Sequence, residues 1–372
     1  MSVDVAIIGG SQAGLALSYY LRQADIDHRV IEAGQVGDCW AERWDSLTLF
    51  SSAQFSALPG MEFPGAPSHY PTKDEVAQYL RTYQRTHDLP VRENTAVGAI
   101  VNTKKGFGLT LDSGDTLAAR AVVLATGAFG EPAIPQIASG LARKMTHVHS
   151  SAYRNPAELE GQNILVVGGG NTGYQIAWEL AEAGKSVELS VRTRLKELPQ
   201  RFLGQDIFWW LNTFRVLEVK RGSRRAKRMG NKDIIIGRGR KKLIRKGITF
   251  RSEAVEAHKR TVTFADGQAS SPDAIVWATG FRYDDSWVQI PEALDENGVL
   301  VTDDGHCPVE GLYTLGRVWQ RDRGSSLTGF VGRDAFRLAT DINHNLYYPE
   351  PALTQFTAGL VQQDRGGNSH VQ

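Results

Sequence analysis

The stretches VAIIGGSQAG, residues 5–14, and ILVVGGGNTG, residues 164–173, decide the fold. Each is a run of apolar residues followed by closely spaced glycines, the pattern of a buried parallel strand that turns directly into a helix. An Ala-Thr-Gly tripeptide follows each stretch at a similar distance, at residues 125–127 and 278–280. Two such stretches in one chain predict two dinucleotides held side by side, an arrangement that suits electron transfer from a nicotinamide to a flavin.

The first glycine turn favours an adenine dinucleotide without a 2′-phosphate. Gly9 allows the tight turn and Gly14 allows close packing of helix on strand, while Ser11 takes the middle position of the pattern. The N-terminus of the following helix would receive the pyrophosphate. A carboxylate at the expected end of the second strand can accept hydrogen bonds from ribose hydroxyls and would repel a 2′-phosphate. The predicted cofactor is FAD, with contacts from Gly9, Ser11, Gln12, Ala13, Gly14 and Glu32.

The second glycine turn favours NADPH over NADH. Its glycine pattern is complete, and its second strand ends in Val-Arg-Thr-Arg, residues 191–194, without an acid. A guanidinium matches a phosphate bidentately, and a threonine hydroxyl can add a further hydrogen bond. The simpler interpretation is that arginines at a strand end are only solvated. The predicted contacts are Gly168, Gly170, Asn171, Thr172, Gly173, Arg192 and Thr193.

The order of these motifs predicts an α/β protein with two Rossmann-like domains, the NADPH-binding domain being inserted in the FAD-binding domain. Residues 1–155 would begin the FAD-binding domain and residues 281–350 would complete it. Residues 156–280 would bind NADPH and would carry a helical, basic insertion at about 195–247. Residues 351–372 would form a polar C-terminal tail.

Hydrophobic periodicity places the elements of these domains. A capping box of Thr72 and Glu75 marks the start of an amphipathic helix at 73–86. Residues 34–67 are expected to be loop, because they are rich in Gly, Pro, Ser and Trp. The remaining predictions are strands at 3–8, 28–32, 121–125, 163–167, 186–191 and 273–278, and helices at 15–22 and 172–183.

Length and composition limit the class of protein. The chain has 372 residues, enough for two domains, and a net charge of +1, which gives no overall attraction to nucleic acid. Its two cysteines, Cys39 and Cys307, form no CxxC pair, which argues against a dithiol centre and a metal site. No signal peptide and no transmembrane run of about 18 apolar residues is predicted. We expect a cytoplasmic protein without a nucleic-acid partner, and a homodimer stays one option for its oligomeric state.

The insertion combines the aromatic run Phe208-Trp209-Trp210 with a basic stretch at 220–246. Aromatic residues beside basic ones can serve nucleic acid or a membrane surface. A lid over the active site with a solvated basic face explains the same pattern. The lid is the favoured interpretation, since no recognisable binding motif accompanies the charges.

The chain resembles the flavin-containing monooxygenases and their Baeyer–Villiger relatives, and in particular short bacterial forms similar to the auxin-forming flavin monooxygenases of plants. The resemblance extends roughly from Val3 to Thr340 and rests on several segments besides the glycine turns. They are GDCW at 37–40, DSLTL at 45–49, LPG at 58–60, FP at 63–64, YPT at 70–72, His149 with Ser150 and Tyr153, ATGF at 278–281, and GLYTLG at 311–316.

The resemblance implies FAD as the bound prosthetic group, NADPH as the reductant and O2 as co-substrate. In this family a C4a-hydroperoxyflavin oxygenates a small amine, sulfide, ketone or keto acid, and the protein excludes water from the flavin. It adds Trp40, Thr126, Gly127, Thr279, Gly280 and Gly316 to the expected cofactor contacts.

One departure from the family concerns the flavin. Many members have an asparagine where this chain has Phe50, and phenylalanine cannot hydrogen-bond the hydroperoxide. Phe50 is therefore the one candidate near the flavin C4a, and no catalytic acid–base pair is predicted. It favours a first alternative, an NAD(P)H oxidase or reductase that releases peroxide or passes electrons to an acceptor. A second alternative is a flavin-binding, redox-sensing accessory protein of a transport system.

Overall fold

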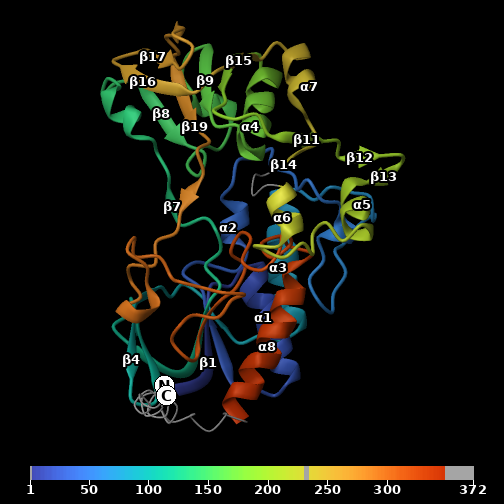
Figure 1. Ribbon diagram of the computed structural model, residues 1–372, viewed down its shortest axis with the longest axis vertical. Coiled ribbons are helices and arrows are strands. Elements are labelled where there is room, and N and C mark those ends of the chain that lie inside the picture. The colour runs from blue at the N-terminus through green and yellow to red at the C-terminus, as the bar shows by residue number, and fades with distance from the viewer. Residues whose placement is uncertain (1, 230–233, 348–372) are drawn as a thin grey trace, which may run out of the picture.

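The computed structural model describes residues 2–229 and 234–347, and it has two lobes joined by a middle region that we call the waist (Figure 1). The predicted tail at 351–372 and residues 230–233 of the insertion lie outside the described residues. The described part of the chain begins and ends in the lower lobe, with β1 and α8 (Figure 1). Within the described part of the chain, no helix is both long and apolar enough to span a bilayer.

The lower lobe is built on a seven-stranded sheet. Its strand order is β3-β2-β1-β6-β5-β4, and β21 also pairs with β6. The strands β1, β2, β3, β6 and β21 are parallel neighbours, whereas β4, β5 and β6 form an antiparallel meander. The bounds are β1 Ser2–Ile8, β2 His28–Ile31, β3 Val91–Arg92, β4 Val97–Thr103, β5 Gly106–Leu111, β6 Thr116–Leu124 and β21 Leu312–Thr314.

Three helices cover one face of this sheet: α1 (Gln12–Gln23), α3 (Lys73–Thr86) and α8 (Val331–Tyr347). Helix α8 packs along α1, so the end of the described chain returns to the lobe in which the chain began. Helix α3 has both predicted capping-box bonds between Thr72 and Glu75. The predicted loop at 34–67 is not entirely irregular, because α2 (Asp38–Ala41) and the 3₁₀ turn η1 (Ala53–Phe55) interrupt it.

The upper lobe carries a five-stranded parallel sheet in the order β15-β10-β9-β19-β8. Helix α4 (Asn171–Glu182) connects β9 to β10 and packs on both, as a right-handed βαβ crossover requires. A small antiparallel sheet, β16-β17-β18, lies beside it. The bounds are β8 Thr146–His149, β9 Asn163–Val167, β10 Ser186–Ser190, β15 Thr249–Arg251, β16 Ala254–His258, β17 Thr261–Phe264, β18 Ala269–Ser270 and β19 Ala274–Trp277.

Two short antiparallel strands, β7 (Glu131–Pro132) and β20 (Phe281–Arg282), form part of the waist. The predicted insertion begins and ends at the upper lobe, where α7 packs on α4, and its middle part, with α5 and α6, extends toward the lower lobe (Figure 1). Its elements are β11 Lys196–Leu198, β12 Arg201–Phe202, β13 Gln205–Asp206, α5 Ile207–Thr213, α6 Arg224–Met229, β14 Ile234–Ile236 and α7 Arg240–Arg245. The 3₁₀ turns η2 (Gln136–Gly140), η3 (Pro156–Glu158) and η4 (Pro291–Ala293) complete the described structure.

Candidate functional site

The first glycine turn connects β1 to α1 with no room for side chains. Gly9 has a φ of +108°, and a Cβ atom there would lie 2.6 Å from the carbonyl oxygen of Ala125. A Cβ atom at Gly14 would lie 1.9 Å from the carbonyl oxygen of Gly9. Both positions therefore require glycine, as the motif predicts. The Ala125 contact also brings the first Ala-Thr-Gly tripeptide against this turn.

The N-terminus of α1 is left open for an anion. Ser11 is the N-cap residue, but its side chain accepts no hydrogen bond from the helix backbone and instead donates to the Gln12 side chain. The Trp40 indole also donates to Gln12 Oε1, at 3.2 Å. Gly316, which follows β21, would bring a Cβ atom within 2.8 Å of the Ala13 Cβ atom. The predicted contacts Ser11, Gln12, Ala13, Trp40 and Gly316 are thus gathered around one helix N-terminus, where the helix dipole favours a pyrophosphate.

Glu32 lies directly after β2 and points back toward the same turn. Its carboxylate accepts a hydrogen bond from the backbone N–H of Gly10 and another, at 3.2 Å, from that of Gly34. The side chain is half-buried. A carboxylate held at this place fits a ribose hydroxyl and disfavours a 2′-phosphate.

The second glycine turn repeats this geometry in the upper lobe. Gly168 has a φ of +138°, and a Cβ atom there would lie 2.1 Å from the carbonyl oxygen of Ala278. A Cβ atom at Gly173 would lie 2.0 Å from the carbonyl oxygen of Gly168. Gly170 differs, because a Cβ atom there would meet open space. The turn thus leaves a cradle at the N-terminus of α4 that a phosphate can fill.

Of the residues predicted around this cradle, some are free to contact a phosphate and one binds the insertion instead. Arg192 and Thr193 are exposed, and Arg192 forms no ion pair within residues 2–229 and 234–347, so its guanidinium is available for a phosphate. Thr172, in the first turn of α4, is half-buried. The Asn171 amide instead holds the insertion: it donates to the Ile234 carbonyl and accepts from the Ile236 N–H.

The insertion adds two arginines near α4 that the sequence analysis did not single out. Arg238 lies 4.7 Å from the ring centre of Trp178 on α4, and Arg240 lies 3.8 Å from that of Phe250 on β15. The sequence did not indicate these arginines because they lie more than 60 residues after the glycine turn. The hydrogen bonds between Asn171 and β14 bring their segment back to the upper lobe.

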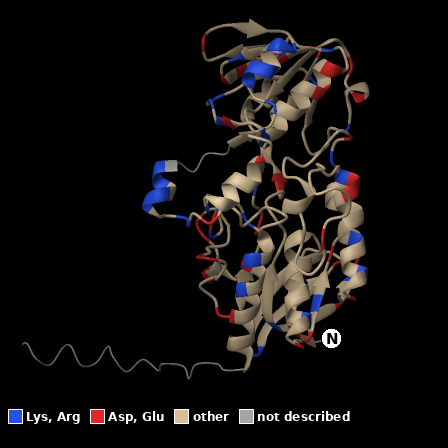
Figure 2. Ribbon diagram, turned by 90° about the vertical axis from the view of Figure 1, so that its right-hand side faces the viewer, with Lys and Arg blue, Asp and Glu red and all other residues tan. Residues whose placement is uncertain are grey.

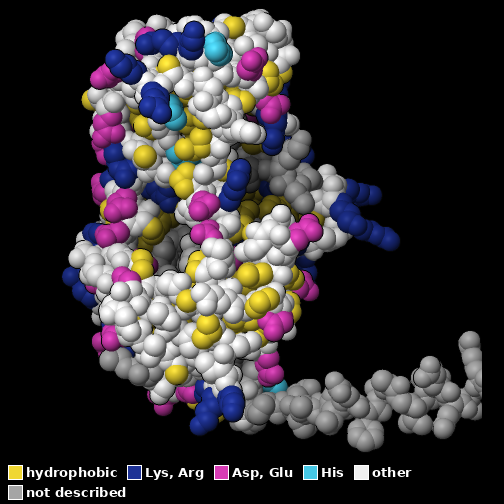
Figure 3. Space-filling view, turned by 90° about the vertical axis from the view of Figure 1, so that its left-hand side faces the viewer, with side chains coloured by type: hydrophobic (Ala, Val, Ile, Leu, Met, Phe, Trp, Pro, Cys, Tyr) yellow, Lys and Arg dark blue, Asp and Glu magenta, His cyan; other side chains and the backbone are white. Residues whose placement is uncertain are grey.

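The two Ala-Thr-Gly tripeptides lie at the waist. Thr126 and Gly127 line a cavity of about 290 Å³ together with residues 283–285, and the surface is hollowed between the lobes in the face shown in Figure 3. The Thr279 hydroxyl donates to the Ala133 carbonyl at 2.7 Å, next to β7. The Gly280 carbonyl accepts from His149 Nε2 at 2.9 Å. Burial lowers the pKa of His149, which favours the neutral imidazole, and the carbonyl acceptor requires that Nε2 carries a proton.

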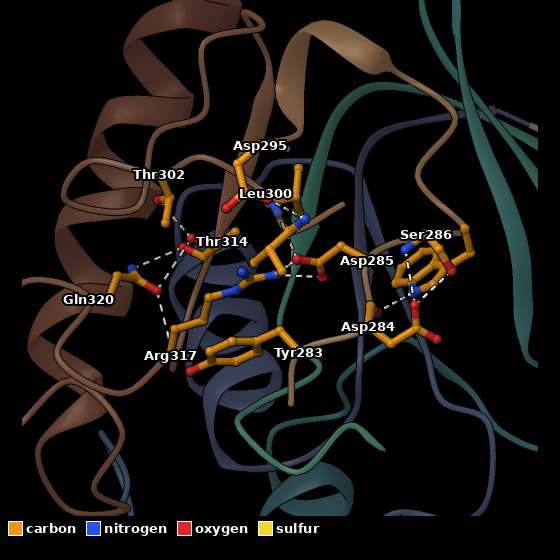
Figure 4. A network of polar contacts seen from close by, with 12 residues as sticks. Tyr283, Asp284, Asp285, Ser286, Asp295, Leu300, Thr302, Thr314, Arg317 and Gln320 are labelled. Carbon is orange, nitrogen blue, oxygen red and sulfur yellow. Dashed lines mark hydrogen bonds and ion pairs between the residues drawn. The ribbon is translucent and has the colours of Figure 1, made fainter. Parts of the chain in front are cut away.

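A buried ion pair beside this cavity was missed from the sequence. Arg317, the residue after Gly316, donates to both carboxylate oxygens of Asp285 at 2.6 and 2.7 Å (Figure 4). The ring of Tyr283 lies under the guanidinium at 4.5 Å, and the Leu300 N–H donates to Asp285. The pair ties the segment after β20 to the end of β21. Both residues stand beside predicted motifs, but a separation of 32 residues gives no signal that they pair.

Phe50 lies in an aromatic cluster between the lower lobe and the insertion. Its ring stacks on Phe208 of α5 at 5.9 Å, and Phe208 stacks on Phe330 at 6.0 Å. Asp206 caps α5 by accepting from the Phe208 N–H, and it also accepts from the Ser52 N–H in the lower lobe. Helix α5 is thereby fastened against the segment that contains Phe50.

Comparison with known proteins identifies the family. The model of the pyridine nucleotide-disulphide oxidoreductase family matches residues 6–316. The chain belongs to this family. An uncharacterized CzcO-like oxidoreductase of Geobacillus kaustophilus is 42% identical over 92% of this chain and 99% of its own length. The indole-3-pyruvate monooxygenase YUCCA8 of Oryza sativa is 27% identical over 90% of each chain.

The solved structures agree with this assignment. A variant of the flavin monooxygenase from Stenotrophomonas maltophilia superimposes with a TM-score of 0.78, at 27% identity over 93% of this chain and 99% of that one. Cyclohexanone monooxygenase, at 15% identity, shares the fold with a TM-score of 0.69. The predictions of an oxidoreductase, of the two-domain Rossmann-type fold and of the flavin monooxygenase resemblance are confirmed. At the level of the family, so are FAD and NADP(H) as cofactors.

Proposed function

We propose that this protein is an FAD-containing, NADPH-dependent monooxygenase that transfers one oxygen atom of O2 to a small-molecule substrate. The observation that carries the proposal is the contrast between the two glycine turns, one followed by Glu32 and the other by Arg192, for which the described residues offer no ion-pair partner. A protein with two interchangeable nucleotide sites would not need this difference. One site accepts an unphosphorylated ribose and the other a phosphorylated one.

The chain's own groups have defined tasks in this proposal. The open end of α1 and Glu32 hold FAD, and the cradle at α4 with Arg192 and Thr193 holds NADPH. His149 fastens the second Ala-Thr-Gly tripeptide at the waist and so fixes the strand that leads from the nicotinamide site back to the lower lobe. The flavin, when bound, supplies hydride acceptance and oxygen activation, and the aromatic cluster of Phe50, Phe208 and Phe330 keeps water away.

A similar protein suggests a variant with which to test the proposed 2′-phosphate contact. The Stenotrophomonas maltophilia variant carries Arg and Thr in place of consecutive Gln and His residues. This chain has Arg-Thr at residues 192–193. The reciprocal double substitution, Arg192→Gln with Thr193→His, is therefore a suitable variant with which to test nucleotide preference.

The substrate proposed is a small amine, sulfide, ketone or keto acid. Among the similar proteins, indole-3-pyruvate monooxygenases and an S-allyl-L-cysteine S-oxygenase bear names that fall in two of these classes. The experiment is a panel of such substrates added to the purified holoenzyme while NADPH, O2, peroxide and product are measured together. The proposal requires one compound that converts peroxide release into product at one mole per mole of NADPH. Peroxide release that no compound reduces would contradict it.

A second candidate function is an NAD(P)H oxidase or reductase, and Phe50 is the observation that favours it. In the structure Phe50 is packed against Phe208 and offers no hydrogen bond. Bacillithiol disulfide reductases share the fold at 19–21% identity, with TM-scores of 0.66–0.68. The same panel distinguishes this candidate, because an oxidase would consume NADPH at a rate that no oxygenation substrate changes.

A further inference from the structure

The insertion exposes large apolar side chains at its outer surface. Phe202, Leu203, Trp209 and Phe214 are 50%, 76%, 38% and 60% exposed. Leu203 stands at the turn between β12 and β13 with a φ of +49°, a conformation that costs free energy in a residue with a branched side chain. These residues fall within 13 positions of the chain, which concentrates exposed apolar surface on one hairpin and one helix.

The aromatic members form one contiguous cluster. Trp210 contacts Phe202, Trp209 and Phe214 with ring centres 6.0, 4.7 and 6.0 Å apart. The Trp210 indole also donates to the Phe202 carbonyl at 2.9 Å, which fastens α5 to the hairpin. We call Phe202, Leu203, Trp209, Trp210 and Phe214 the apolar tip. Its rings are held in place by one another, so their exposure is a fixed feature of the insertion.

A strongly basic segment adjoins the apolar tip. Residues 215–228 contain seven Lys or Arg and a single acid, Glu218, whereas the whole chain has a net charge of +1. Glu218 is already engaged by Arg333 at 3.3 Å. Helix α6 projects from the body of the molecule with Arg224, Arg225, Lys227 and Arg228 exposed (Figures 2 and 3). In the described residues none of these four side chains forms an ion pair, so their charge is uncompensated within the protein.

The two features form one surface. Arg225 donates to the Phe214 carbonyl at 3.1 Å, which joins α6 to the end of α5. In Figure 1, α5 lies between the β12–β13 hairpin and α6. Fixed aromatic and aliphatic side chains beside exposed Lys and Arg are the combination that binds at the boundary between lipid headgroups and acyl chains.

We propose that the apolar tip and α6 dock this protein reversibly on an anionic phospholipid membrane. The basic side chains face the phosphate headgroups while the apolar tip enters the outer part of the acyl layer. A second copy of the chain fits this surface less well, because a symmetric contact would bring two uncompensated basic helices together. A nucleic acid would pair with α6 and stack on the rings, but it would give no role to Leu203, the most exposed of these side chains.

The experiment is co-sedimentation of the purified holoenzyme with vesicles of phosphatidylcholine alone or mixed with phosphatidylglycerol, at low and high salt. We expect binding to the anionic vesicles, at least tenfold weaker binding to the neutral ones, and a clear loss of binding in high salt. No binding to anionic vesicles, or equal binding to both kinds, would overturn the proposal. Sedimentation with an acidic protein or single-stranded DNA but not with vesicles would overturn it too.

Two pairs of variants assign the effect to this surface. Lys227→Gln with Arg228→Gln should lower the partition onto anionic vesicles about 20-fold. Lys104→Gln with Lys105→Gln, at the exposed turn between β4 and β5, should leave it unchanged.

The second pair of variants tests the apolar tip. Leu203→Ser with Phe214→Ser should weaken binding about tenfold, whereas Val255→Ser with Val301→Ser, on other exposed surface, should not. Equal effects of test and control variants would contradict docking at this surface. Flavin content and NADPH oxidation should stay at the wild-type level in all four.

Discussion

Arg192 is the residue on which nucleotide preference depends in this account. Replacing it with Gln, together with Thr193→His, removes the Arg192 guanidinium from the predicted 2′-phosphate position of the strand end. We expect kcat/KM for NADPH to fall about 10- to 100-fold, because a bidentate charge-assisted contact is lost. The value for NADH should hardly change, which serves as the internal control. A parallel loss with both nucleotides would mean that Arg192 acts on structure rather than on the phosphate.

A second prediction concerns Glu32 and the affinity of the protein for FAD. Glu32→Gln keeps the shape of the side chain but removes the charge that accepts hydrogen bonds at the end of β2. The FAD affinity of the apoprotein should fall about tenfold, since charge-assisted hydrogen bonds to ribose hydroxyls become neutral ones. Titration of apoprotein with FAD, followed by flavin fluorescence, measures this. An unchanged dissociation constant would remove Glu32 from the site.

His28 gives the folded state a pH dependence of its own. It is buried, its Nδ1 donates to the Ile26 carbonyl at 2.8 Å, and burial lowers its pKa below the ordinary value of 6.5. The unfolded chain therefore takes up a proton more readily, so the stability that His28 contributes is fully present above pH 6.5 and falls as the pH drops toward the folded-state pKa. The free energy of unfolding should decline less between pH 7 and 5 in His28→Gln than in wild type. Equal slopes would contradict this account.

Helix α5 depends on one buried carboxylate. Asp206 caps the helix and also accepts from Ser52 in the lower lobe, at 2.7 and 3.2 Å. Asp206→Ala should cost about 1–2 kcal/mol of stability, since it removes an N-cap and leaves a buried N–H without a partner. Limited proteolysis should then cut the insertion faster, whereas Asp206→Asn, which keeps one of the two oxygen acceptors, should lie between the alanine variant and wild type. Unchanged proteolysis in the alanine variant would show that α5 is held mainly by Phe208.

The helices and strands that could be predicted are those determined by residues close to one another in the sequence. The apolar run before Gly9, the spacing to Gly14 and the capping box of Thr72 and Glu75 each depend on neighbours within a few residues, and the structure has all of them. Several ends differ by one to three residues; α1, for example, begins at Gln12 because the helix starts at the N-cap Ser11 and not at its first apolar turn. Helix α2 was missed, since four residues are too few to show a period.

What the sequence could not provide are contacts between distant segments. Arg317 and Asp285 pair across 32 residues, and Asn171 holds β14 across more than 60. Such partners are decided by the topology of the folded chain, not by local pattern. The candidate glycines and Glu32 could be selected from the sequence because their motif has fixed spacing. No such motif marks Arg238, Arg240 or the stacking of Phe50 on Phe208.

The molecule as a whole places two open helix ends in separate lobes, with β7 and β20 between them. We propose that the upper lobe would hold NADPH and the lower lobe FAD, and that the bound flavin would supply hydride acceptance and oxygen activation. Rapid mixing tests this most directly: purified yellow protein is reduced anaerobically with NADPH or NADH, and oxygen is then admitted. We predict faster bleaching by NADPH, followed by a transient adduct spectrum between the reduced and oxidised flavin. No bleaching by either nucleotide, or immediate reoxidation with stoichiometric peroxide, would contradict the account.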